Sequence, residues 1–336
     1  MPKPLPYQSY PATEHTPNLV VDGTPNRSTV LSLTHAQGVP APPGYAADLS
    51  AQMVFKYLDH PIAHAPAQAV TNDHFDQDGL VSVFALVAPD QAQRHRKALI
   101  AIAEAGDFAT YQDRSAARAS MVLWCYANQQ RSPIAAQLTG TSPATTARIL
   151  YEHLLPLLPS LITESQRYEP LWREEDARLS ASEQAIRSGV VTIEEEPNDN
   201  LSVILIPRHL PPLQGHRFGT AGLQSPDLHP MAVHNASHGL RQLFIRGRHY
   251  RYMDRYESKV QLQSRRPPPR VDLRPLAQEL SIIEPNATCW YADPPTHLTP
   301  ELSHKGESGL TEAQVRGLIS DHLHKAPAAF KLYAAS

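Results

Sequence analysis

The chain has 336 residues, 41% of them apolar, which is enough to bury the core of one large domain or of about two ordinary ones. Lysine and arginine number 30 against 33 aspartates and glutamates, a balance that argues against a polycation coating nucleic acid and against an acidic disordered tail. Two cysteines, Cys125 and Cys289, are too few for a disulfide framework or a cysteine-based zinc site.

The N-terminal segment carries prolines where a signal peptide would have an apolar run. No stretch approaches the roughly 18–20 apolar residues that a membrane-spanning helix needs. The 32 prolines are scattered along the chain and predict many loops. We therefore expect a cytoplasmic globular protein with no membrane partner.

The first half alternates between short strands and helices. Residues 18–21 form an apolar run that ends in Asp22-Gly23, which predicts a strand followed by a turn. A second strand is predicted over 67–72. Helices are predicted from apolar periodicity over 46–58, 80–87, 91–105, 115–126, 144–158 and 166–187. The pattern predicts an α/β domain over residues 1–188.

Near Gly189 the pattern changes toward strands. Residues 190–193 and 201–206 flank a Pro-Asn-Asp-Asn turn and predict a hairpin. Further strands are predicted over 231–233, 243–245 and 250–263, and helices over 273–280 and 311–323. We expect residues 189–336 to form a second, smaller α+β domain with an antiparallel sheet.

A His-Asp-Asp motif directly follows the second predicted strand. It reads His74-x-Asp76-x-Asp78-Gly79, and in α/β sheets ligands collect beyond the carboxyl ends of strands. The alternate side chains converge if the loop curls at Gly79. One imidazole with two carboxylates suits Mn²⁺ or Mg²⁺, and iron or zinc less well.

Two simpler interpretations of this motif stay open. In the first, Asp78 merely caps the helix that follows, which leaves His74 and Asp76 without a role. In the second, the motif opens an EF-hand calcium loop. That loop needs an acid where this chain has His74 and a bidentate glutamate where it has Ala85, so calcium is disfavoured.

The strand followed by His74-x-Asp76-x-Asp78-Gly79-x-x-Ser82 resembles the first motif of the DHH phosphoesterase superfamily. The resemblance covers about fifteen residues, counted over the strand and the motif that follows it. It implies a parallel-sheet domain that holds two divalent metal ions, with a second domain that binds substrate. It would make His74, Asp76 and Asp78 metal ligands.

Other landmarks of that superfamily are altered. Asp107 would match an isolated family aspartate at a strand end, although an ordinary turn after a helix explains it equally well. The Asp-His-His triplet is absent. In that superfamily a strand precedes the triplet and a helix follows it. The strand ending at Asp22 and the helix over 46–58 resemble these two elements, but here they lie before the first motif. This circularly permuted order makes Asp22 a ligand, with His35 in place of a lost histidine, and leaves one or two ions open.

The whole chain also resembles an uncharacterised group of bacterial proteins. These share the His-Phe-Asp-x-Asp-Gly element and an arginine-rich C-terminal half, and the resemblance implies no function.

Residues 241–274 concentrate positive charge, with nine arginines and Lys259 against three acids. Guanidinium groups bind phosphate bidentately, and the interleaved tyrosines could stack on bases. Residues 251, 255 and 259 share one face of the predicted strand, although a solvated sheet face explains the charge as well. A His/Gly loop precedes the segment. The candidate substrate-binding residues are Arg251, Arg255, Arg265, Arg266, His234 and His238.

These observations together predict a Mn²⁺- or Mg²⁺-dependent hydrolase of a phosphate ester or phosphoanhydride. Its substrate would be a small nucleotide or a short oligonucleotide, hydrolysed by water activated between one or two ions. The catalytic residues would be His74, Asp76 and Asp78, with Asp107 and Asp22 as further ligands. Two alternatives stay open: a non-catalytic phosphate-ligand or nucleic-acid binding protein on a decayed phosphoesterase scaffold, and a metal enzyme with a non-phosphate substrate. The sequence leaves the oligomeric state open.

Overall fold

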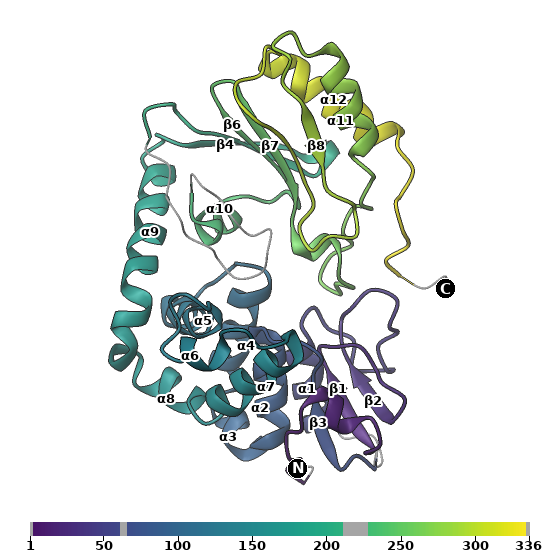
Figure 1. The fold of residues 1–336 in the computed structure, drawn as a ribbon, viewed down its shortest axis with the longest axis vertical. Helices are drawn as coiled ribbons and strands as arrows, with labels where there is room; N and C mark the ends of the chain where they lie inside the picture. The colour runs from purple at the N-terminus through teal and green to yellow at the C-terminus, as the bar shows by residue number, and fades with distance from the viewer. Residues whose placement is uncertain (1–2, 61–65, 211–227, 334–336) are drawn as a thin grey trace. The chain divides into compact units, whose positions relative to one another are not determined.

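The computed structural model describes residues 3–60, 66–210 and 228–333 (Figure 1). Contacts between Cα atoms divide the chain into two compact units. The N-terminal unit comprises residues 1–176 and 261–265, and the C-terminal unit comprises residues 177–260 and 266–336. The division falls inside helix α9 (Glu169–Arg187), upstream of the predicted boundary at residue 188.

A three-stranded parallel sheet lies in the N-terminal unit, with the strand order β2-β1-β3. Its strands are β1 (Asn18–Val21), β2 (Thr29–Leu33) and β3 (Ala69–Thr71). The predicted strands correspond to β1 and β3, whose residues are all buried. Since β1 is central, the chain reaches β2 on one side and β3 on the other, an arrangement in which ligands commonly bind beyond the carboxyl ends of the strands.

Helices make up most of the rest of this unit. The predicted helix over 91–105 is two helices, α3 and α4, which meet at His95. Helix α2 is buried along almost its whole length because it packs between α1 and α4. The helices are α1 (Ser50–Asp59), α2 (Gln77–Val87), α3 (Pro89–Arg94), α4 (Arg96–Asp107), α5 (Arg114–Ala127), α6 (Ala135–Leu138), α7 (Pro143–Leu154) and α8 (Leu158–Thr163), with 3-10 turns at Tyr10–Thr13 and Ser165–Tyr168.

The C-terminal unit is built on a six-stranded mixed sheet with the order β4-β5-β6-β7-β9-β8. The predicted hairpin is confirmed as the antiparallel pair β4–β5. The predicted antiparallel pairing holds for four of the five strand pairs of the sheet. The exception is β5 with β6, which are parallel, and the chain crosses between them through α10. The strands are β4 (Thr192–Glu196), β5 (Leu201–Leu205), β6 (Arg241–Arg246), β7 (His249–Asp254), β8 (Trp290–Ala292) and β9 (Glu301–His304).

One predicted strand of this unit is wrong, and another is shorter than predicted. Residues 231–233 lie in helix α10 (Pro230–Ala236), where Pro230 occupies the first turn and the His229 side chain accepts a hydrogen bond from the Met231 amide. The strand predicted over 250–263 ends at Asp254 and is followed by a 3-10 turn at Tyr256–Ser258. A further 3-10 turn, at Pro197–Asp199, lies between β4 and β5.

Helices α11 (Arg274–Ile283) and α12 (Glu312–Lys325) lie beside the sheet (Figure 1). The main apolar core of this unit lies between them and one face of the sheet. A smaller apolar cluster on the opposite face involves β5, β6 and α10. The predicted mixed α/β class is therefore confirmed. In the described part of the chain, no helix combines the length and the apolar character needed to span a membrane.

Candidate metal centre

The carboxyl ends of the three parallel strands bring polar side chains from distant parts of the sequence to one edge of the sheet. Asp22 directly follows β1, His35 lies just beyond β2, and His74 lies just beyond β3. Asp78 stands in the first turn of α2 and Asp107 is the last residue of α4. These residues and Asp76 form two adjoining groups, each with the spacing of a metal site.

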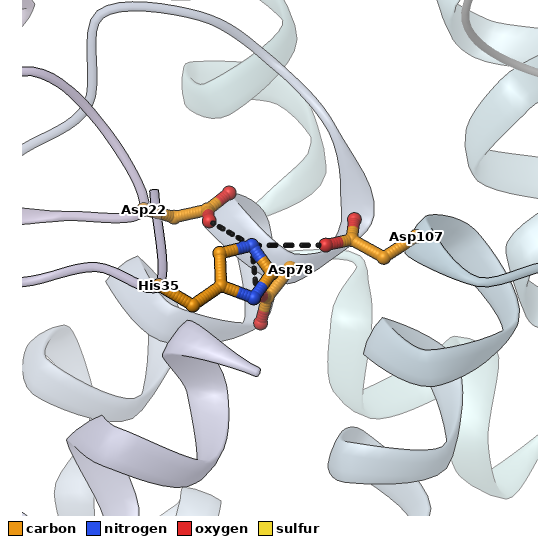
Figure 2. A group of neighbouring side chains, drawn as sticks. All are labelled: Asp22, His35, Asp78 and Asp107. Atoms are coloured by element: carbon orange, nitrogen blue, oxygen red, sulfur yellow. Dashed lines mark ion pairs between the residues drawn. The ribbon is translucent and has the colours of Figure 1, made fainter. Parts of the chain in front are cut away.

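The first group, here called the His35 group, consists of Asp22, His35, Asp78 and Asp107 (Figure 2). The His35 Nε2 atom lies 3.5 Å from Asp22 Oδ1, 3.5 Å from Asp107 Oδ2 and 4.0 Å from Asp78 Oδ2. None of the four side chains is more than 5% exposed. Three carboxylates and one imidazole are therefore enclosed together.

A backbone contact fixes which nitrogen of His35 faces the carboxylates. Its Nδ1 atom lies at hydrogen-bond distance from the Asp48 carbonyl, which can only accept a hydrogen bond. Nδ1 must therefore carry a proton, and Nε2 is the atom left toward the three acids. Metal-binding histidines are commonly held in this way, with the second ring nitrogen donating to a carbonyl.

The second group, here called the His74 group, consists of Asp22, His74 and Asp76. The His74 Nε2 atom lies 2.9 Å from Asp76 Oδ2 and 3.8 Å from Asp22 Oδ2. On its other side, His74 Nδ1 lies 2.7 Å from an oxygen of Asp73. The His74 side chain is 50% exposed, so solvent reaches this group while the His35 group is enclosed.

Asp22 belongs to both groups and joins them. Its Oδ1 atom faces His35 and accepts a hydrogen bond from the Ser50 hydroxyl at 2.8 Å, whereas its Oδ2 atom faces His74. The residue has a positive φ of 52°, a left-handed conformation that aspartate adopts more readily than most residues.

Backbone amides hold Asp76 and Asp78 in place. Asp76 Oδ1 accepts a hydrogen bond from the Gly79 amide at 2.7 Å, so Asp76 is the residue that caps α2. The two oxygens of Asp78 accept the amides of Ser50 and Ala51 at the start of α1, each at 2.7 Å. The alternative in which Asp78 caps its own helix is therefore wrong.

Burial and mutual repulsion oppose the ionisation of two of these carboxyl groups. Burial, followed by the charges of Asp76, Asp78 and Asp107, raises the pKa of Asp22 well above its usual value. Burial and the charge of Asp76 raise the pKa of Asp78 to about 6, although His35 counteracts them.

His74 and Asp76 show the opposite trend because they form an ion pair. Burial alone would raise the pKa of Asp76, but the charge and hydrogen bond of His74 lower it to about 2. Burial alone would lower the pKa of His74, but Asp76 raises it well above its usual value. Four carboxylates nevertheless share this small space with two imidazoles.

The donor set and its spacing fit hard divalent cations. Mg²⁺ contacts oxygen at about 2.0–2.1 Å, so ligands on opposite sides of one ion lie about 4 Å apart, and Mn²⁺ takes the same kinds of ligand. Within each group the ligand atoms lie within 4.8 Å of one another. Asp22 Oδ2 is buried and accepts no hydrogen bond within the described residues. Cations would also offset the repulsion among the buried acids.

The structure thus brings together every predicted metal ligand, although not every ligand lies in the predicted kind of element. Asp107 ends a helix, not a strand. Sequence reasoning missed Asp73 and Ser50. Asp73 adjoins the motif without its alternate spacing, and Ser50 is recognisable only as the first residue of a helix that points at the site.

The predicted substrate-binding residues differ in their burial and in their partners. Arg255 is 2% exposed and pairs with the equally buried Glu257, so its charge is already neutralised inside the C-terminal unit. Strand β7 ends at Asp254, before Arg255. The prediction that residues 251, 255 and 259 share one face of a single strand is therefore wrong. Arg251 pairs with Glu301.

The remaining candidates differ in exposure. His234 is buried in α10, and His238 is exposed beyond it. Arg265 and Arg266 are exposed, and the Arg266 guanidinium lies 5.2 Å from the ring centre of Tyr333.

Comparison with known proteins places the chain in a family but indicates no reaction. We found no match among the curated proteins and none among the solved structures. One family model covers residues 3–325, a range that includes the His35 group, the His74 group and nearly all of the C-terminal unit. The chain therefore belongs to the family described as "Family of unknown function (DUF6687)".

Proposed function

We propose that the protein is a metal-dependent hydrolase of a phosphate ester or phosphoanhydride, with Mn²⁺ or Mg²⁺ as its cofactor. The observation that carries the proposal is the convergence of two ligand groups on one shared carboxylate, Asp22. In this proposal the His35 group and the His74 group each hold one ion. Two adjacent divalent ions supply the Lewis acidity that activates water and neutralises charge at a phosphoryl group.

The residues of the chain have separate tasks in this arrangement. Asp73 and the Asp48 carbonyl orient the two imidazoles, and the amides at the start of α1 orient Asp78. The half-exposed His74 marks the side of the centre that a substrate can reach. The His35 group is enclosed, and charge interactions are stronger there than in bulk water because the dielectric constant is lower.

The resemblance to DHH phosphoesterases remains a proposal, and the site supports it in one respect. The permuted order requires that Asp22 and His35, far upstream, meet the motif of His74, Asp76 and Asp78. Both residues lie within the two ligand groups. This convergence favours a catalytic centre over a decayed scaffold, because binding of a phosphate alone does not need six metal-ligating side chains.

Metal titration and hydrolysis assays test the proposal together. We expect the EDTA-treated chain to bind two Mn²⁺ ions and, when loaded, to hydrolyse bis-p-nitrophenyl phosphate but not p-nitrophenyl acetate. Asp76→Asn should remove the ion of the His74 group and lower the rate by at least about 100-fold, since metal activation supplies several kcal/mol.

Asp90→Asn is the matched control, because Asp90 is an exposed acid in the first turn of α3 outside the centre. It should bind two ions and react at the normal rate. The proposal fails if the native chain binds no Mn²⁺, or if the acetate ester is hydrolysed and the phosphodiester is not.

A further inference from the structure

One face of the C-terminal sheet is only partly covered. Helices α11 and α12 cover the first face, and α10 covers β5 and β6 on the second. Across β6, β7, β9 and β8 the second face carries a row of directly paired residues. Strand register places Phe244 opposite Arg251, Arg251 opposite Ser303, and Ser303 opposite Tyr291. Paired residues point to the same side of a sheet, so these four side chains form one line across four strands.

This row forms part of a hollow of about 600 Å³, a volume within the range of small-molecule sites. All residues lining it belong to the C-terminal unit. Its charged lining consists of three arginines and two glutamates, so the lining carries one excess positive charge when the histidines are neutral. These residues are Arg208, Arg246, Arg251, Glu301 and Glu307.

The three guanidinium groups are held from different directions. Arg251 lies over the Phe244 ring, 4.6 Å from its centre, and 3.5 Å from a carboxylate oxygen of Glu301. Arg246 donates to the carbonyls of Arg208 and Leu210. Such contacts fix the groups before a ligand arrives, which lowers the entropy cost of binding.

Arg208 lies across the turn between β6 and β7. Gly247 in that turn has a φ of 63°, and a Cβ atom there would lie 2.1 Å from Arg208 Nε. The absence of a side chain at Gly247 therefore makes room for this guanidinium group. Arg208 also pairs with Glu307 at 3.1 Å.

Aromatic side chains line the same hollow. Tyr291 is 51% exposed on the edge strand β8, and the rings of His249 and His304 are parallel at 6.2 Å. The Nε2 atom of His304 accepts a hydrogen bond from the Tyr250 amide, and burial, followed by the charge of His249, lowers the pKa of this ring. The hollow thus offers flat rings beside fixed guanidinium groups.

We propose that this hollow binds a nucleotide, with its phosphate on the arginines and its base against Tyr291 and the guanidinium plane of Arg251. Guanidinium forks match phosphate oxygens, and bases stack on aromatic rings and on arginine. That the bound nucleotide is part of the substrate rests on the proposed phosphoester hydrolysis. The binding itself does not depend on that activity.

Calorimetric titration of the full chain in EDTA tests the binding without a contribution from the metal centre. We expect adenosine 5′-monophosphate to bind at least about tenfold more tightly than adenosine or inorganic phosphate, because both recognition elements contribute. Arg208→Ala and Tyr291→Ala change exposed side chains and should each weaken binding about tenfold. Arg251→Gln should weaken it at least as much.

Arg274→Ala is the matched control, since Arg274 is exposed at the start of α11 and pairs with Asp272. It should bind the nucleotide normally, and so should Asp76→Asn. The inference is overturned if the nucleotide gives no heat at millimolar concentration, if phosphate alone binds as tightly, or if Arg208→Ala, Tyr291→Ala and Arg251→Gln all bind normally. Nucleotide binding without Mn²⁺-dependent hydrolysis would sustain this inference and defeat the proposed function. Mn²⁺-dependent hydrolysis without nucleotide binding in EDTA would overturn this inference and sustain the proposed function.

Discussion

At the scale of single residues, Asp73 shows how a side chain outside the ligand set can control it. Its Oδ1 atom lies 2.7 Å from His74 Nδ1, and its Oδ2 atom accepts the Thr24 amide at 3.2 Å. Burial alone would raise the pKa of Asp73, but the hydrogen bond and charge of His74 lower it. Asp73 is therefore an ionised partner that fixes the ring and leaves Nε2 toward Asp22 and Asp76.

We expect Asp73→Ala to weaken Mn²⁺ binding at the His74 group about 10- to 100-fold, the usual cost of removing a partner of a metal-binding histidine. Two-site titration of the EDTA-treated chain measures this, because the ion of the His35 group should keep its affinity. Asp73→Asn retains an acceptor and should lie between Asp73→Ala and the native chain. Equal weakening of both ions, or of neither, would show that Asp73 does not orient His74.

At the scale of elements, the approach of α4 to α2 determines where Asp107 lies. Gly106 precedes Asp107, and a Cβ atom on Gly106 would lie 2.5 Å from the Cβ atom of Gln77 in α2. A contact this short between two helices cannot be relieved by turning a flexible side chain. Gly106 is therefore needed for the close packing that brings the end of α4 to the sheet edge.

Gly106→Ala should lower the free energy of unfolding by about 1–3 kcal/mol, the usual range for an overpacked core. Gly317→Ala, in the exposed part of α12, is the matched control, because nothing lies within 4 Å of a Cβ atom there. That change should raise the free energy of unfolding by up to about 1 kcal/mol. Urea titrations of both variants measure the difference, and a stabilised Gly106→Ala would refute the packing argument.

The strands that were predicted correctly are more completely buried than the strand that was missed, so their apolar character is clearer in the sequence. Strands β1 and β3 are wholly buried apolar runs, whereas β2 alternates less clearly and has only its last residue buried. Residues 231–233 are too few to distinguish a strand from a helix by periodicity, and Pro230 at the first helical position was the better signal.

In the candidate site, the residues that lie close together in the sequence were easier to predict than those brought together by the fold. His74, Asp76 and Asp78 were predictable because they share one short motif, whereas Asp22 and His35 required a hypothesis about a permuted order. Ser50 and the Asp48 carbonyl contact the site through the start of α1, and such contacts depend on how helices pack. The fixed pairing of Arg255 with Glu257 was equally invisible, because a charge count does not distinguish a buried pair from a binding surface.

At the scale of the whole molecule, the cluster of buried acids predicts an unusual dependence of stability on pH. Carboxylates that are paired or hydrogen-bonded in a folded protein usually have lowered pKa values and stabilise the fold as pH rises. Here the pKa values of Asp22 and Asp78 are raised, so their folded forms hold protons that the unfolded chain has already lost. The raised pKa of His74 acts in the same direction above its unfolded value of 6.5.

We therefore expect the N-terminal unit, without metal, to lose stability as pH rises from about 5 to 8, because the unfolded state binds fewer protons than the folded state over that range. Trp124 and Trp172 belong to this unit and Trp290 to the other, so urea unfolding of a Trp290→Phe variant in EDTA follows the N-terminal unit by fluorescence. Saturating Mn²⁺ should abolish the fall, since a ligand that binds only the folded state stabilises it.

The variant Asp22→Asn separates this electrostatic cause from a general effect of pH. Asparagine also tolerates the left-handed backbone at position 22 and can still accept the Ser50 hydroxyl, but it carries no charge. In EDTA at pH 8 it should therefore be more stable than the native chain and show a shallower fall with pH, while it binds Mn²⁺ more weakly. If the metal-free native unit instead gains stability from pH 5 to 8, or if Asp22→Asn is the less stable form, repulsion among the buried acids does not govern this centre.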